Sequence, residues 1–313
     1  MLSHSELRNA MAAPISKLVL LALVGVAASN PDEKATLLGD DLPPYAASKA
    51  YCNGSLSMCP RPEDCCASAY SPSHFGCTVD VGDLPARSAG CGDGLGPANA
   101  TSVCCKMGPE KPPHATKKNV LIIGDSVSIG YTTLATKNVE ALLFDVAQVQ
   151  HGPWDVSDGG AGDAATGVAC LDRWLLTQAM VPVKWDVITF NFGLHDMTNS
   201  SHCEGLYASQ LANVTARLAA LGAKLVYFTT TPYMPLRAAG NTVVEDMNDI
   251  ALEIMEPYGV DVVDLYATVT DHCGAVYTDC DVCRAHPCSF HYNDAGMNAQ
   301  AAVVAGAIAA ALA

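Results

Sequence analysis

A buried strand that runs directly into a tight turn constrains this chain more than any other feature. The apolar run at 119–123 is followed at once by Gly124-Asp125-Ser126, and residues 129–138 continue with helical character. Ser and Asp commonly cap helices, because their side chains bond the free N–H groups of the first turn. We therefore predict a strand, a turn and a helix. This arrangement places the Ser126 hydroxyl at the carboxyl end of a strand, beside N–H groups that stabilise negative charge.

From residue 118 onward, short apolar runs alternate with amphipathic segments. The apolar runs have the length of buried strands, and the amphipathic segments have the length of helices. We predict strands at 118–124, 143–149, 185–192, 224–229 and 260–265, and helices at 129–138, 164–176, 206–221, 243–257 and 294–312. Strands joined by helical crossovers form a parallel sheet covered on both faces. The predicted fold class is therefore α/β, a flavodoxin-like three-layer α/β/α domain with a five-stranded sheet and its site at the carboxyl ends of the strands.

The N-terminus has the pattern of a secretory signal peptide. Residues 1–17 are polar and carry Arg8 and Lys17, residues 18–28 are apolar, and small residues stand where cleavage would occur. The apolar run is about half the length that spans a bilayer. We therefore expect residues 1–28 to be removed and the protein to be secreted. Retention as a signal anchor in the membrane is the alternative.

Cysteines and glycosylation sequons also favour an extracellular protein. The chain contains 14 cysteines and four sequons, which begin at Asn53, Asn99, Asn199 and Asn213. Disulfides and N-glycans both form in the secretory pathway. The formal net charge is −15, which disfavours nucleic acid and other polyanions as partners. We expect a soluble glycoprotein that does not bind nucleic acid.

A cysteine-rich segment precedes the predicted α/β domain. It contains eight cysteines, with frequent Gly and Pro and little aliphatic sequence: Cys52, Cys59, Cys65, Cys66, Cys77, Cys91, Cys104 and Cys105. A hydrophobic core cannot stabilise such a segment, so we expect four disulfides, with a zinc cluster as the alternative. We divide the remaining chain into a linker at 29–51, a disulfide-rich module at 52–106, a Pro- and Lys-rich linker at 107–117 and the α/β domain at 118–313.

The Cys-rich module loosely resembles a granulin-type module. The resemblance rests on Cys59-Pro60, Cys65-Cys66 and the closing pair Cys104-Cys105, while the spacing between Cys77 and Cys104 departs from that pattern. The resemblance therefore implies only that residues 52–106 form a small extracellular module held by disulfides. Such a module is a candidate for binding an extracellular surface or wall, or for spacing the second domain from it.

Polar or glycine-rich segments follow the predicted strands. Ser126 follows the first strand, the loop at 158–163 (DGGAGD) follows the second, and the segment at 191–196 (NFGLHD) follows the third. His291 stands 165 residues beyond Ser126, just before the last helix, where this topology returns it to the same edge of the sheet. A serine beside a histidine forms a nucleophile with its base. The pattern therefore indicates a site for nucleophilic catalysis.

These segments resemble the sequence blocks of the SGNH (GDSL-like) hydrolase family, over about residues 118–313. The turn at 124–126 is similar to the nucleophile block, and one glycine among Gly159, Gly160 and Gly162 is similar to the second block, which forms the oxyanion hole. The segment at 193–196 is similar to the third block, and His291 ahead of residues 294–296 (DAG) is similar to the fifth. The resemblance implies the SGNH hydrolase fold and hydrolysis of carboxylic esters without a cofactor or metal.

The resemblance also implies a role for each site residue. His291 takes the proton of Ser126, whose oxygen attacks an ester carbonyl. The oxyanion is then held by the Ser126 N–H, by the N–H of Gly162 or Gly160, and by the His195 side chain. The substrate is a small-molecule or glycan ester.

Two positions depart from the family pattern. The third block usually has Asn where this chain has His195, so an imidazole N–H would bind the oxyanion. The fifth block usually has Asp three residues before the histidine, where this chain has Cys288. Losing an orienting Asp lowers the rate by several orders of magnitude unless another group fixes the histidine tautomer. The candidate orienters of the histidine are a backbone carbonyl and Asp281. Some family members resemble this chain in the GLHD variation, and that resemblance implies a Ser-His dyad that works without the Asp.

Six further cysteines and three candidate substrate-contacting residues lie in the predicted α/β domain. Cys280-x₂-Cys283, together with Cys273, Cys288, His272 and His286, allows a zinc site. In a secreted chain we expect instead two disulfides that pin the loop carrying His291. Cys170 and Cys203 are candidates for a further pair. Trp154, Tyr233 and Met234 are candidate substrate contacts.

Three functions therefore compete. The first is a secreted serine ester hydrolase, with O-acylated glycans as candidate substrates. The second is a catalytically decayed extracellular binding protein, in which the Cys-rich module makes the interaction. Cys288 in place of Asp favours the second, while Ser126, the glycine loop and His291 favour the first. A disulfide-stapled structural wall protein explains the module but not the residues at the sheet edge.

Overall fold

The computed structural model describes residues 65–67, 75–80, 102–105, 108–142, 147–153, 160–196, 204–235, 242–274 and 278–313. All of them belong to one compact unit, Ala47–Ala313. The predicted signal peptide at 1–28, the linker at 29–51 and the sequons at Asn53, Asn99 and Asn199 lie outside the described residues. Secretion and glycosylation therefore stay predictions.

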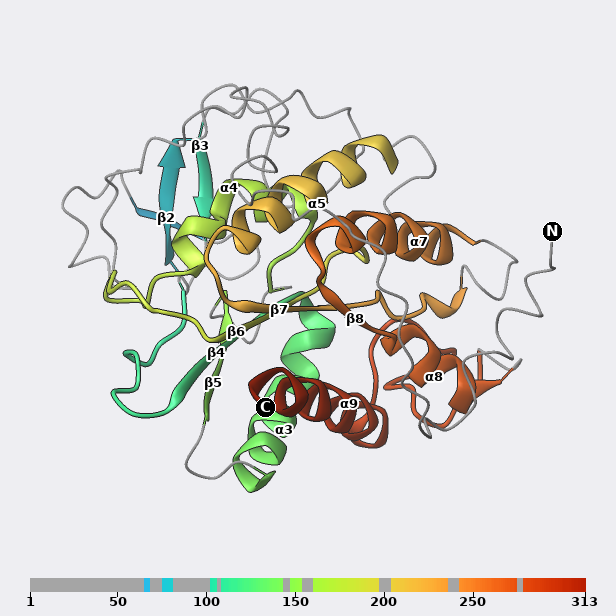
Figure 1. The fold of residues 1–313 in the computed structure, drawn as a ribbon. Helices are drawn as coiled ribbons and strands as arrows, with labels where there is room; N and C mark the ends of the chain where they lie inside the picture. Colours follow the sequence, from blue (N-terminus) through green and yellow to red (C-terminus); the bar gives the residue numbers. More distant parts are fainter. Residues whose placement is uncertain are drawn as a thin grey trace, which may run out of the picture. The chain divides into compact units, whose positions relative to one another are not determined.

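Five parallel strands form the central sheet, in the order β5-β4-β6-β7-β8 (Figure 1). The strands are β4 (Lys118–Ile123), β5 (Ala147–Gly152), β6 (Val187–Phe190), β7 (Lys224–Phe228) and β8 (Asp261–Val263). The last four residues of β4 are at most 1% exposed, as expected for an inner strand of a parallel sheet with helices on both faces. The strand order is the flavodoxin-like one, so the predicted fold class is confirmed.

Helices cover both faces of the sheet (Figure 1). Helices α3 (Ser126–Leu142), α8 (Leu265–Cys273) and α9 (Asp294–Leu312) gather on one face, and α4 (Ala164–Trp174), α5 (Glu204–Ala219) and α7 (Val243–Met255) on the other. The short 3₁₀ helix η5 (Glu256–Tyr258) follows α7. Helix α9 is apolar and long enough to cross a membrane by composition alone, and in this fold its buried face packs on α3 and the sheet.

The boundaries of several elements differ from the predictions. Helix α8 was not predicted, because it has only nine residues and follows a strand immediately. The side chain of Asp264 accepts a hydrogen bond from Ala267 N (2.9 Å), which begins α8 and ends β8 before Leu265. β5 lies later in the chain than the predicted strand at 143–149, with residues 143–146 outside the described part.

The described part of the Cys-rich module is a small antiparallel sheet. Its strands are β1 (Cys65–Ala67), β2 (Phe75–Asp80) and β3 (Ser102–Cys105), paired in that order. Cys105 at the end of β3 forms a disulfide with Cys170 in α4, with a Cα–Cα distance of 5.3 Å. The eight cysteines therefore do not form four disulfides among themselves, and the predicted pair of Cys170 with Cys203 is wrong. The similarity of the module to granulin stays a prediction.

The segment at 108–117, which we expected to be a linker, hydrogen-bonds with the sheet domain. Pro109 O accepts from Gln178 N (2.9 Å), and Lys111 N donates to the Gln150 side chain on β5 (2.9 Å). Gly108 is pressed against the end of α4 and the residues just after it, since a Cβ there would lie 2.9 Å from Arg173 O and 1.8 Å from Leu176 O. The chain entering β4 is thus held along the edge strand of the sheet.

Candidate active site

The structure brings Ser126 and His291 together at the carboxyl end of β4. Ser126 is the first residue of α3, and its Oγ lies 2.9 Å from His291 Nε2. His291 comes from the loop before α9, 165 residues further along the chain. Both residues are half-buried and keep some surface exposed to solvent. This distance suits proton transfer from a serine nucleophile to a histidine base.

Buried polar contacts hold the nucleophile turn. Asp125 Oδ1 accepts from Val127 N (2.9 Å), and the Ser128 hydroxyl donates to Asp125 O (2.6 Å). Behind them, His151 at the end of β5 contacts Ser128 Oγ through its Nε2 (2.7 Å) and Pro153 O through its Nδ1 (3.0 Å). These groups fix the backbone from which Ser126 projects. We did not predict the contacts of Ser128 and His151, although His151 also stands at the carboxyl end of a strand.

The two candidate glycines of the oxyanion hole occupy different environments. Gly160 is buried against the nucleophile turn, where Asp125 and Gly160 form a β-bridge and a Cβ on Gly160 would lie 2.3 Å from Gly124 O. Gly162 is half-exposed, and its N–H donates to no acceptor in the described part of the chain. We infer that Gly160 shapes the turn and that Gly162 offers the backbone N–H. Gly159 lies outside the described residues.

His195 lies near the reacting pair. It is half-exposed and close enough to Asp125 and His291 to shift the pKa of both. The next residue, Asp196, accepts from Ala164 N at the start of α4 (3.0 and 3.2 Å). This bond joins the loop after β6 to the loop that carries Gly162, so the two candidate oxyanion donors are positioned together.

Asp281 does not orient His291, contrary to one of our expectations. Its carboxylate is exposed and bonds His272 Nε2 at 2.7 Å; this bond is the main cause that lowers the pKa of Asp281. Cys288 is bonded to Cys283, so it cannot replace the missing carboxylate either. Within the described residues, His291 Nδ1 has no hydrogen-bonding partner.

Other contacts hold the His291 loop. Arg284 N donates to His291 O (3.0 Å), and Asn293 N donates to Val282 O (2.9 Å). The paired segment at 282–284 is closed by the Cys283–Cys288 disulfide, and Cys273–Cys280 lies just before it. The two predicted disulfides of this loop are therefore confirmed. The backbone fixes where the histidine stands, while Phe290 packs against its ring at 4.5 Å between centroids.

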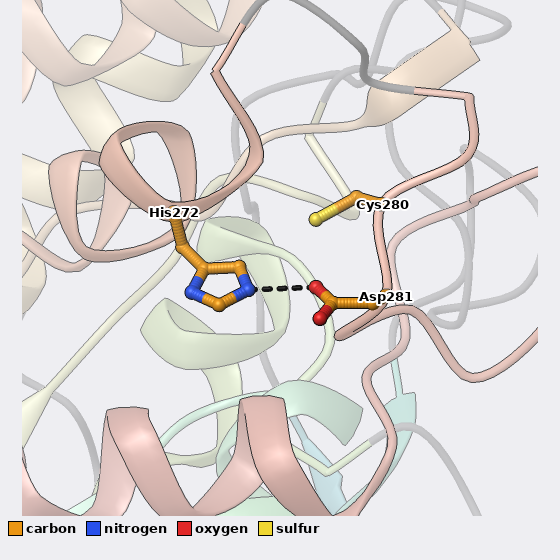
Figure 2. Close-up of side chains that lie close together, drawn as sticks. All are labelled: His272, Cys280 and Asp281. Carbon is orange, nitrogen blue, oxygen red and sulfur yellow. Dashed lines mark hydrogen bonds and ion pairs between the residues drawn. The ribbon is translucent and has the colours of Figure 1, made fainter.

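The alternative zinc site fails because its cysteines are disulfide-bonded. His272, Cys280 and Asp281 offer ligand atoms within 4.8 Å of one another, and Figure 2 shows the three side chains gathered around the His272–Asp281 hydrogen bond. Cys280 is bonded to Cys273, however, and only a thiolate sulfur is a good zinc ligand. His286 lies apart from this group and contacts Asp279.

The candidate substrate contacts separate into three cases. Tyr233 is half-exposed and packs against Phe290, with ring centroids 5.5 Å apart. Met234 is fully buried in the core, so the expectation that it contacts substrate is wrong. Its N–H donates to Ser289 O (3.3 Å). This hydrogen bond ties the loop that carries His291 to the segment after β7. Trp154 lies outside the described residues.

Burial shifts the pKa of both ionisable groups beside Ser126. Burial, with the Arg284 guanidinium, holds the pKa of His291 below its ordinary 6.5, although Asp125 acts in the opposite direction. Burial raises the pKa of Asp125, while His195 and backbone N–H groups oppose that shift. A histidine with a lowered pKa is neutral at neutral pH, as a general base must be.

Comparison with known proteins identifies the family. The model of the GDSL-like lipase/acylhydrolase family matches residues 122–299, more than half of the chain. The chain belongs to the GDSL-like lipase/acylhydrolase family. The match begins within β4 and ends within α9, so it includes Ser126, His195 and His291. A GDSL-like lipase/acylhydrolase is a carboxylic ester hydrolase, as predicted.

Solved structures similar to this GDSL-like protein share little sequence with it. A lipase/acylhydrolase from Enterococcus faecalis is 16% identical (TM-score 0.49), covering 61% of this chain and 95% of that one. The acetylxylan esterase Axe2 from Geobacillus stearothermophilus is 14% identical (TM-score 0.46; 63% and 94%). A carbohydrate esterase family 3 protein from Talaromyces cellulolyticus is 14% identical (TM-score 0.46; 62% and 98%). The comparison with curated proteins found no match.

The role inferred for His195 predicts a specific loss in this GDSL-like enzyme. We expect His195→Ala to lower kcat about 10²- to 10³-fold with little change in KM, because an oxyanion donor acts mainly in the transition state. His195→Asn supplies an amide donor at the same position and should retain more activity than His195→Ala. Steady-state kinetics on p-nitrophenyl acetate tests this. Equal kcat in wild type and His195→Ala would remove His195 from the oxyanion hole.

Proposed function

We propose that this protein is a secreted serine ester hydrolase that removes acyl groups from glycans, with a Ser126–His291 dyad. The observation that carries the proposal is the 2.9 Å contact between Ser126 Oγ and His291 Nε2. A nucleophile and its base lie within hydrogen-bond reach, at the edge of the sheet where α/β enzymes bind their ligands.

The mechanism is acyl transfer in two steps. His291 Nε2 takes the Ser126 proton while Oγ attacks the ester carbonyl, and the oxyanion is held by the Gly162 N–H and the His195 side chain. The tetrahedral intermediate collapses when His291 returns the proton to the leaving alcohol, which leaves an acyl-Ser126 ester. His291 then takes a proton from water, which attacks that ester, and His291 returns the proton to Ser126 Oγ as the carboxylic acid leaves.

Two features support a glycan as the alcohol part of the substrate. Ser126 and His291 are both half-exposed, so an ester on a large polymer can reach them. Tyr233 and Phe290 add a half-exposed aromatic pair next to His291, and such rings contribute much of the contact area in ligand sites. The secretory pattern of the sequence agrees with a substrate outside the cell.

Acetate release from a chemically acetylated oligosaccharide tests the proposal. The disulfide-intact full chain should release acetate from this substrate and from p-nitrophenyl acetate, with Ser126→Ala as the blank, and should hydrolyse p-nitrophenyl palmitate poorly. Turnover of p-nitrophenyl acetate without acetate release from the glycan would retain the esterase and reject the glycan. Preference for palmitate over acetate would reject an acetylated glycan as the substrate. N-terminal sequencing of protein secreted by an expressing cell tests the removal of residues 1–28.

A further inference from the structure

We propose that Asp125 supplies the negative charge that stabilises the His291 imidazolium during the reaction, in place of the carboxylate missing at position 288. Asp125 would then be a positioning residue as well as a helix cap. The inference rests on the proposed Ser126–His291 mechanism, because it concerns the proton that this mechanism transfers.

The placement of Asp125 exceeds what a helix cap requires. Asp125 directly precedes Ser126 in the chain and is only 2% exposed. Oδ1 accepts from Val127 N, which is the capping bond. Oδ2 is buried and has no hydrogen-bonding partner among the residues that the structure describes. Burying a carboxylate oxygen without a hydrogen bond costs folding free energy. Such a cost is explained if the oxygen stabilises a positive charge that forms nearby during the reaction.

The charged and titratable groups around this carboxylate come from several elements. Asp125 acts electrostatically on His195 after β6, on His291 before α9, on Tyr131 in α3 and on Tyr292. Both tyrosines remain neutral, since burial and Asp125 raise the pKa of each well above 10. His291 also faces Arg284. Asp125 directly precedes Ser126, whose Oγ lies 2.9 Å from His291 Nε2. Among the described residues it is the one carboxylate that raises the pKa of His291.

This arrangement matches the charge that the mechanism creates. When His291 takes the Ser126 proton, its ring becomes cationic in a partly buried site, where a fixed carboxylate favours the cation. Burial raises the pKa of Asp125, while His195 and the Val127 and Ser128 N–H groups oppose that shift. The positive end of α3 also favours the ionised carboxylate. The family's usual carboxylate stands three residues before the histidine, where this chain has Cys288. Asp125, next to the nucleophile Ser126, provides the negative charge instead.

The pH dependence of kcat in charge-removing variants tests this proposal. Wild type should lose activity with a midpoint below pH 6.5, because His291 must be neutral and its pKa is lowered. In Asp125→Asn, we expect the midpoint to move down by about one pH unit and the plateau to fall about 10- to 100-fold. Asp125→Ser, which retains a capping oxygen, should move the midpoint in the same direction if the asparagine amide is poorly accommodated.

Asp281→Asn is the matched control, because it removes the same charge from an exposed side chain bonded to His272. It should leave both the midpoint and the plateau unchanged. NMR titration of His291 in wild type and Asp125→Asn measures the same shift without turnover, so it separates this proposal from the esterase proposal. A lower plateau with an unmoved midpoint, or an equal shift in Asp281→Asn, would reduce Asp125 to a helix cap.

Discussion

Ser126→Ala and His291→Ala should each lower kcat on p-nitrophenyl acetate by about 10³-fold or more. The alanine at position 126 removes the atom that forms the acyl-enzyme, and the alanine at position 291 removes the base 2.9 Å from it. The measurement is steady-state hydrolysis by the disulfide-intact full chain. Because both residues act on the same proton, the double variant should lose little more than either single variant.

His286→Ala is the control for the histidine variant. It removes an exposed imidazole from the same loop, one that forms an ion-pair contact with Asp279, and it should leave kcat unchanged. If His291→Ala retained wild-type activity while Ser126→Ala lost it, His291 would not be the base. If the two losses multiplied in the double variant, the residues would act independently and the dyad would be wrong.

Gly160→Ala should abolish most activity and destabilise the fold by about 3 kcal/mol or more. Gly160 adopts a positive φ of 64°, where a side chain costs about 1–2 kcal/mol. In addition, the new Cβ would lie 2.3 Å from Gly124 O, so either the nucleophile turn or the glycine loop must move. Urea unfolding with disulfides intact and the kcat of the folded fraction measure the two effects.

Gly222→Ala separates the clash from the backbone strain. Gly222 has a similar φ of 72°, with nothing within 4 Å of the added Cβ. It should therefore lose only about 1–2 kcal/mol of stability and retain full activity. Equal losses of stability and activity in the two variants would show that the contact between Gly160 and the nucleophile turn does not matter.

The fold could be predicted because its signals are local and periodic. The run at 120–123 is buried on both faces, and such runs alternate regularly with amphipathic helices along the chain. The flavodoxin-like order then brings the carboxyl ends of the strands to one edge. This topology predicts that Ser126 and His291 lie together, and the 2.9 Å contact between their side chains agrees with it.

The missed features depend on contacts that sequence spacing does not encode. Cys170 pairs with Cys105, 65 residues away, rather than with a nearer cysteine. Asp281 was placed beside His291 by its position in the chain, but the loop turns it toward His272. Met234 follows a half-exposed tyrosine and is itself fully buried. In each case the partner is chosen by how a loop folds back, which hydrophobic periodicity does not report.

The separation of Ser126 and His291 along the chain has a consequence for biosynthesis. The nucleophile emerges from the ribosome with the first strand of the sheet, whereas the histidine emerges 165 residues later, just ahead of the final helix. Chains grow at about 5–20 residues per second, so a nascent enzyme exposes its serine for many seconds with no base beside it. A polypeptide that ends before residue 291 lacks this base and should be inactive, so turnover requires that synthesis has reached the loop before α9.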